Sequence, residues 1–185
     1  MDFTKHYELQ GKHAFLSPSQ NAWLNYDEEK LKRIVTNSRA IKLGTRLHEL
    51  ASELIELKQK LPRSNKTLNA FVNDAIGYRM ESEVVLYFSE FCFGTADAIS
   101  FKKNLLRIHD LKTGVTPVSI QQLMVYSALF CLEYKKSPSE IDIELRIYQL
   151  DEVITYIPTP EEVRRCMDRI IESDKIISMM DGGTY

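Results

Sequence analysis

The sequence has few of the residues and segments that mark several large classes of protein. Its three cysteines, Cys92, Cys131 and Cys166, lie far apart and form no C-x-x-C pair. We therefore expect no zinc site, no iron–sulfur cluster and no disulfide framework, which suits a reducing compartment. The first residues, MDFTKHYELQ, lack the apolar core of a signal peptide, and no later apolar run reaches membrane-spanning length. These features predict a cytoplasmic protein that has no membrane partner.

An excess of charge and most catalytic motifs are also missing. The formal net charge is −2, from 24 Lys and Arg against 26 Asp and Glu, so contact with nucleic acid would need a local basic patch. There is no G-x-S-x-G, no phosphate-binding glycine loop and no H-E-x-x-H. At 185 residues, 44% hydrophobic and 27% charged, the chain has the composition of one soluble domain with its own core.

Hydrophobic periodicity predicts an α+β fold with a central mixed sheet flanked by helices. We expect a single domain over residues 1–185, with a helical part at 1–80, a sheet core at 81–157 and a C-terminal helix at 158–180. The helices are predicted at 16–26 (capped by Ser17), 27–40, 39–60, 66–80, 116–134 (starting at Thr116–Pro117) and from Thr159, where Glu162 completes a capping box. The helix at 39–60 has an apolar stripe of Leu43, Leu47, Leu50, Ala51, Leu54 and Leu57. The strands are predicted at 82–90, 92–101, 104–112, 141–150 and 152–157.

Two of these strands carry acids on an otherwise apolar face. Alternation places Leu106, Ile108, Asp110 and Lys112 on one side of their strand, and Asp97 on a side with Ile99. A buried charge is costly unless it is paired or bound to a metal. Asp110 and Lys112 could form a salt bridge, and Asp97 could face solvent at a strand end. The two acids could instead converge on Mg²⁺ or Mn²⁺, which prefer carboxylate oxygens.

Other polar residues stand at positions where a structural role competes with a functional one. His48 lies at the edge of the apolar stripe, one turn after Gly44, and a glycine inside a helix suggests close approach of another group. Gln122 and Tyr126 share one face of an apolar helix and must find partners. Six basic residues lie between positions 30 and 46, with no acid among them: Lys30, Lys32, Arg33, Arg39, Lys42 and Arg46. They form either a groove that guides a DNA strand or a solvated basic face.

The order GTRLH, GTADAI, HDLKTG and QLMVY resembles the PD-(D/E)XK nuclease superfamily, in its RecB-like and lambda-exonuclease-like branch. In that branch a helical histidine precedes a G-x-x-D strand, a D/E-x-K strand and a Q-x-x-x-Y helix. The segment LSPSQNAWL also looks like the opening of related phage and bacterial exonucleases. The resemblance spans about residues 16–150 and implies an αβββαβ core.

The resemblance implies a free-standing, metal-dependent deoxyribonuclease, an exonuclease of DNA recombination, repair or phage DNA processing. His48, Asp97, Asp110 and the carbonyl of Leu111 would hold one or two Mg²⁺ or Mn²⁺ ions. Lys112 would act with Asp97 and Asp110 in catalysis. The other implied residues would brace the site or touch DNA: Gln122, Tyr126, Arg39, Lys42 and Arg46. Two alternatives stay open, namely a catalytically silent DNA-binding module and a subunit active only within a larger complex. Lambda-type relatives form rings, so a homo-oligomer or a recombination-protein partner also stays open.

Overall fold

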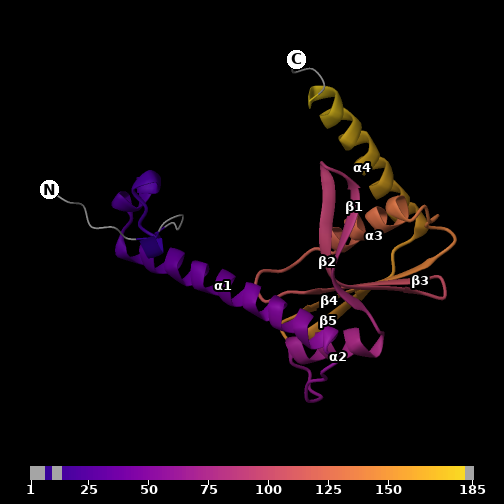
Figure 1. Ribbon diagram of the computed structural model, residues 1–185, viewed down its shortest axis with the longest axis horizontal. Helices are drawn as coiled ribbons and strands as arrows, with labels where there is room; N and C mark the ends of the chain where they lie inside the picture. The colour runs from indigo at the N-terminus through magenta and orange to yellow at the C-terminus, as the bar shows by residue number, and fades with distance from the viewer. Residues whose placement is uncertain (1–6, 10–13, 182–185) are drawn as a thin grey trace. The chain divides into compact units, whose positions relative to one another are not determined.

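The structure is a computed structural model that describes residues 7–9 and 14–181. Its core is a five-stranded sheet in the order β1-β2-β3-β4-β5, formed by β1 (Glu81–Ser89), β2 (Cys92–Lys102), β3 (Leu105–Leu111), β4 (Asp142–Gln149) and β5 (Glu152–Tyr156). The helices are α1 (Glu28–Glu56), α2 (Thr67–Gly77), α3 (Gln121–Glu133) and α4 (Pro160–Asp181), with 3₁₀ helices at Tyr7–Leu9 and Pro18–Asn25. The predicted α+β class with a mixed, helix-flanked sheet is confirmed (Figure 1).

The chain divides into two compact units, one up to Lys42 and one from Leu43, so the boundary falls inside α1. In the first unit Asp27 caps α1, because its Oδ1 accepts a hydrogen bond from the Lys30 N–H at 2.7 Å. The predicted Ser17 cap is wrong. The Ser17 hydroxyl pairs with the Ser19 hydroxyl at 2.9 Å and makes no capping hydrogen bond, and the helix it precedes is a 3₁₀ helix.

The helix α1 differs from its prediction in two ways. It is one helix rather than two, because residues 28–56 contain no proline that would end it. Its buried face is also narrower than the predicted stripe, since Leu43, Leu50 and Leu57 are 58%, 42% and 65% exposed. The residues of α1 that are buried are Gly44, Ala51, Leu54 and Ile55.

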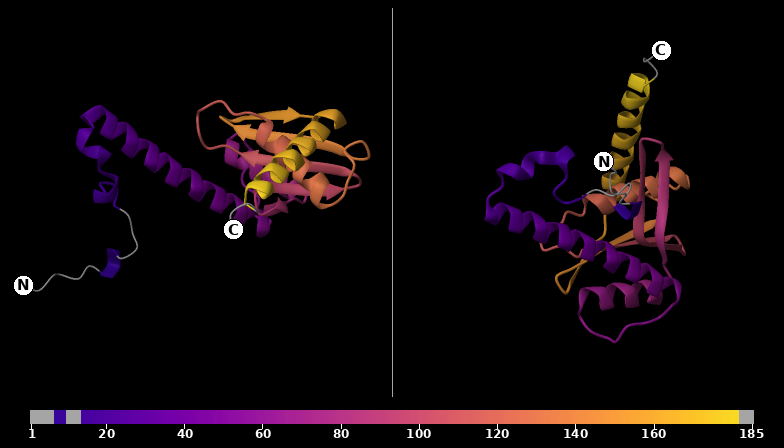
Figure 2. Two further views of the ribbon diagram at one scale, coloured as in Figure 1. Left: turned by 90° about the horizontal axis from the view of Figure 1, so that it is seen from above. Right: turned by 60° about the vertical axis from the view of Figure 1, so that its left-hand side comes forward.

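The sheet combines an antiparallel meander with one parallel crossover. β1, β2 and β3 pair antiparallel in sequence, β3 pairs parallel with β4, and β5 returns antiparallel along β4. The connection between the parallel strands is α3, which is apolar on most sides and packs against β1 and α4. Figure 2 shows α2 on one side of the sheet and α3 with α4 on the other. Two buried clusters result, one under α3 and one under α2.

The helix α3 begins at Gln121, not at the predicted Thr116–Pro117. The residues before it form a loop that is bound to the end of β4. The Gln149 side-chain amide donates to the carbonyls of Gly114 at 2.7 Å and Thr116 at 2.8 Å. These contacts satisfy backbone acceptors in a non-helical segment, which local sequence signals did not indicate.

The start of α4 is as predicted. The Glu162 carboxylate accepts from the Thr159 N–H at 2.7 Å, and the Thr159 hydroxyl accepts from the Glu162 N–H at 3.3 Å, which is the predicted capping box. Within residues 7–9 and 14–181, none of the helices combines the length and apolar character needed to cross a bilayer.

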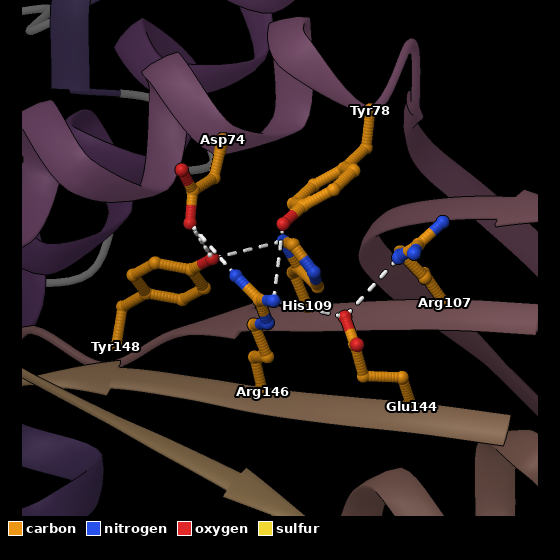
Figure 3. A network of polar contacts seen from close by, with 7 residues as sticks. All are labelled: Asp74, Tyr78, Arg107, His109, Glu144, Arg146 and Tyr148. Carbon is orange, nitrogen blue, oxygen red and sulfur yellow. Dashed lines mark hydrogen bonds and ion pairs between the residues drawn. The ribbon is translucent and has the colours of Figure 1, made fainter.

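A buried polar network attaches α2 to β3 and β4 (Figure 3). Tyr148 donates a hydrogen bond to Asp74 at 2.7 Å, and Arg146 donates to the same carboxylate at 3.0 Å. His109 Nδ1 lies 3.1 Å from the Tyr148 hydroxyl oxygen. His109 therefore faces α2, as alternation along β3 predicts, while its neighbour Asp110 faces the opposite side of the sheet.

Candidate metal centre

The candidate site lies where β2 and β3 separate. Their last backbone pair at this end is Ala98 with His109, so the next residues along the two strands are Asp97 and Asp110. Asp97 Oδ2 accepts a hydrogen bond from the Leu111 N–H at 2.8 Å. The Asp97 carboxylate thus accepts from a backbone N–H that no longer pairs with β2. The end of the β2–β3 pairing therefore fixes the position of this carboxylate.

His48 reaches this point from α1. Its Nδ1 lies 3.5 Å from Asp97 Oδ2, and both side chains are only partly exposed. The hydrogen bond to Asp97 is the main reason why the pKa of His48 is raised above 6.5. The predicted association of His48 with Asp97 is therefore present, and the two side chains come from a helix and a strand far apart in sequence.

Glu83 is a third member of the cluster that sequence reasoning missed. One ligand atom from each of His48, Glu83 and Asp97 lies within 4.8 Å of the others. Glu83 is exposed, and loss of hydration followed by repulsion from Asp97 raises its pKa. The register of the hairpin pairs Ser82 with Ala98 and Val84 with Ala96, which sets Glu83 opposite Asp97, and the sequence alone does not show this register.

Asp110 lies outside that three-residue group and interacts with Lys112. Lys112 Nζ is 2.9 Å from both carboxylate oxygens of Asp110 and donates a hydrogen bond to Oδ1. The same Nζ donates to Gln122 Oε1 at 2.8 Å, and the Gln122 amide donates to the Tyr126 hydroxyl at 3.2 Å. The salt bridge considered from sequence is therefore present, and Lys112 is also held by the Gln122–Tyr126 pair of α3.

The Asp110 carboxylate has unused capacity as a ligand. It is 2% exposed, and its Oδ2 lies 2.9 Å from Lys112 Nζ but accepts no well-aligned hydrogen bond from any of the described residues. Burial is the main reason why the pKa of Asp110 is raised, and the nearby Asp97 raises it further. Three carboxylates against one lysine leave an excess of negative charge at the strand ends. Oxygen donors with one imidazole fit Mg²⁺ or Mn²⁺, so the residues present suit the expected ion.

Two glycines make this packing possible. A Cβ on Gly44 would lie 2.7 Å from Thr113 Oγ1, so the loop after Lys112 approaches α1 at a position where a side chain would collide. A Cβ on Gly94 would lie 2.9 Å from Tyr126 Cε1, so the tyrosine ring lies against the backbone of β2. The group that approaches Gly44 is the Thr113 side chain, not the backbone or ligand that the sequence suggested.

A cavity of about 450 Å³ adjoins Lys112 and Leu111. Leu47, Leu68 and Leu150 supply apolar walls, and the exposed ion pair of Lys66 with Asp151, at 2.6 Å, stands at its edge. The cavity therefore opens beside the lysine of the site.

The basic residues predicted to contact DNA are divided between the two units. Arg39 and Lys42 belong to the first unit, whereas Arg46 is exposed on α1 in the second, two residues before His48. The DNA-contact role of all three stays a prediction, and so does the role of the Leu111 carbonyl as a ligand.

Comparison with known proteins gives no further assignment. No family model matches this chain, and neither a curated protein nor a solved structure matches it.

Proposed function

We propose that the protein is a divalent-metal-dependent nuclease that hydrolyses phosphodiester bonds in DNA. One observation carries this proposal: Glu83, Asp97, Asp110 and His48 gather at the open end of the sheet beside Lys112. A bound Mg²⁺ or Mn²⁺ ion would polarise the scissile phosphate and lower the pKa of a water molecule. The PD-(D/E)XK resemblance agrees with this chemistry.

The residues of the chain have separate roles in the proposal. His48, Glu83, Asp97, Asp110 and the Leu111 carbonyl hold the ion. Lys112 orients the attacking water or neutralises charge that develops on the phosphate, which suits a compact ammonium group. Gln122 positions Lys112 through the 2.8 Å hydrogen bond, and Tyr126 positions Gln122 in turn.

The finer parts of the proposal depend on the resemblance alone. These are exonuclease action, a role in recombination, repair or phage DNA processing, and a cytoplasmic location (the host cytoplasm, for a phage protein). The cavity beside Lys112 supports nucleotide binding, because it offers apolar walls next to the proposed position of the phosphate.

The strongest competing interpretation is that Asp110 and Lys112 form only a structural ion pair in a silent DNA-binding module. The adjacent His48–Glu83–Asp97 group argues against it, because a structural ion pair does not need a second cluster of possible metal ligands beside it. A subunit that cuts only within a larger complex would have the same residues.

The test is to incubate the purified chain with end-labelled linear DNA and with closed circular DNA, in Mg²⁺, Mn²⁺ or EDTA. We expect degradation of linear DNA with either metal and none in EDTA. Equal cleavage in EDTA would refute metal dependence, and equally fast cutting of circles would refute the preference for ends. Binding of DNA with no cleavage in either metal would support the silent module or the dependent subunit.

A further inference from the structure

The β1–β2 hairpin exposes an aromatic surface that the proposed chemistry does not use. Tyr87 and Phe93 are 50% and 62% exposed and are paired across the two strands. Their rings are stacked, with centroids 6.4 Å apart and planes inclined by 28°. Beside them Val85 is 54% exposed and is paired with the exposed Thr95. We call Val85, Tyr87, Phe93 and Thr95 the aromatic face.

The aromatic face continues directly from the candidate metal centre. Glu83 and Asp97 are opposite each other in the hairpin, and Tyr87 and Phe93 lie four residues further along the same two strands. Four residues of strand span about 13 Å. Between them lies the Val85–Thr95 pair, which is on the same side of the hairpin as Tyr87 and Phe93. On the opposite side Leu86 and Ala96 are fully buried, so that side packs into the core.

The β1–β2 hairpin has one positively charged residue, Lys102, at the end of β2 that is farthest from the aromatic face. Residues 81–101 contain neither lysine nor arginine. A strand of nucleic acid would therefore gain little from its phosphates here, whereas aromatic rings stack on every base regardless of sequence. Stacking also requires bases that are not already paired, which selects single-stranded segments.

We propose that Tyr87 and Phe93 form a stacking platform for unpaired bases of the DNA strand that leaves the metal centre along the β1–β2 hairpin. This inference rests on the proposed nuclease function and refines it, since it makes single-stranded ends or overhangs the preferred substrate. Figure 1 shows the hairpin extending past the other strands of the sheet.

Three other occupants of the aromatic face have different signatures. A second copy of the chain would change the oligomeric state when the rings are removed. Another part of the same chain would make the rings important for stability. A protein partner would need apolar area but not aromatic rings, so leucine would serve nearly as well as phenylalanine or tyrosine.

The experiment measures fluorescence anisotropy of a labelled oligothymidylate of about twelve nucleotides, which lies within the usual site size of single-strand binders. A blunt duplex of equal length is the second probe, and Ca²⁺ is the metal. The variant is Tyr87→Ala/Phe93→Ala. The control is Tyr134→Ala, because Tyr134 is also 50% exposed but lies at the end of α3.

We expect the double variant to bind oligothymidylate at least about tenfold more weakly, while its affinity for the blunt duplex changes less than about twofold. The salt dependence of binding should keep its slope, because no phosphate contact is lost. Tyr87→Trp/Phe93→Tyr should bind normally, and Tyr87→Leu/Phe93→Leu should not.

Any of five results would overturn the inference. Three concern binding: unchanged binding of oligothymidylate by the alanine variant, an equal loss in Tyr134→Ala, or full binding by the leucine variant. The other two are a changed oligomeric state and a large loss of stability in the alanine variant. Cleavage of end-labelled linear DNA by the wild-type chain in Mg²⁺ is assayed separately. Cleavage together with unchanged single-strand binding would refute the platform alone. No cleavage by the wild-type chain, with ring-dependent binding, would refute the nuclease proposal and leave the platform as a binding site.

Discussion

His109 should make the protein less stable in mild acid, for reasons visible in the network of Figure 3. It is fully buried on β3, and burial, followed by repulsion from Arg146 and Arg107, lowers its pKa from 6.5 to about 3. Tyr148 donates its proton to Asp74, so the His109 Nδ1–H donates to the Tyr148 oxygen. Nε2 is then left without a hydrogen-bond partner among the described residues, and a second proton would have no acceptor there. The remaining polar groups of this network are Tyr78 and Glu144.

The sign and size of the effect follow from the two pKa values. Because the folded-state pKa lies below that of the unfolded chain, acid protonates His109 mainly in the unfolded chain, which stabilises that state. The resulting loss begins near pH 6.5 and is complete near pH 3. Between pH 7 and pH 5 the folded imidazole stays neutral while the unfolded one becomes charged. This difference lowers the free energy of unfolding by about 2 kcal/mol.

The assay is urea unfolding followed by circular dichroism at pH 7 and pH 5, in EDTA. The wild-type chain should lose about 2 kcal/mol more than His109→Asn over this interval. His109→Phe serves as a second variant if the asparagine variant folds poorly. Tyr148→Phe is the matched control, because it removes the hydroxyl contact but keeps the imidazole, so its pH dependence should follow that of the wild type. Equal losses in the wild type and His109→Asn would refute the assignment of a neutral, buried imidazole.

The remaining predictions concern the candidate site. Lys112→Ala should lower kcat about 10²–10³-fold with KM little changed, and Lys112→Arg should not restore it; a wild-type rate in Lys112→Ala would leave the lysine only a structural partner. Asp110→Ala should abolish cleavage and weaken Mn²⁺ binding in calorimetry, whereas Lys112→Ala should bind Mn²⁺ normally. Asp110→Ala should leave the free energy of unfolding equal or slightly higher, because it removes a buried charge while Lys112, which is 27% exposed, keeps its hydrogen bond to Gln122; a loss of several kcal/mol would point to a structural pair. Glu83→Gln should weaken Mn²⁺ binding about tenfold without changing stability, because Glu83 is exposed, and unchanged metal affinity would remove it from the ligand set. Gly94→Ala should cost about 1–3 kcal/mol of stability by displacing the Tyr126 ring, and a double-mutant cycle with Tyr126→Ala should show that most of this cost disappears when the ring is absent.

Local patterns were sufficient to predict the type and order of most elements. The segments in which apolar and polar residues alternate form β1 to β5, and the Thr159–Glu162 capping box starts α4. Both signals could be recognised because they act between residues close in sequence. Predictions failed where distant residues decide the local conformation. The start of α3 moved to Gln121 because Gln149, from β4, holds the preceding loop. The predicted stripe of α1 was too wide, because the sequence does not show how much of a helix its neighbours cover.

The sequence by itself determined which acids and which lysine stand on apolar strand faces, because side-chain alternation is a property of the strand alone. Tertiary structure decided which of them meet. The register of β1 with β2 brings Glu83 opposite Asp97, and the end of the β2–β3 ladder turns the Asp97 carboxylate toward Leu111. The packing of α1 then adds His48 to the same point. Pairing register and helix packing depend on contacts between residues far apart in the chain, and for that reason Glu83 is evident only in the folded protein.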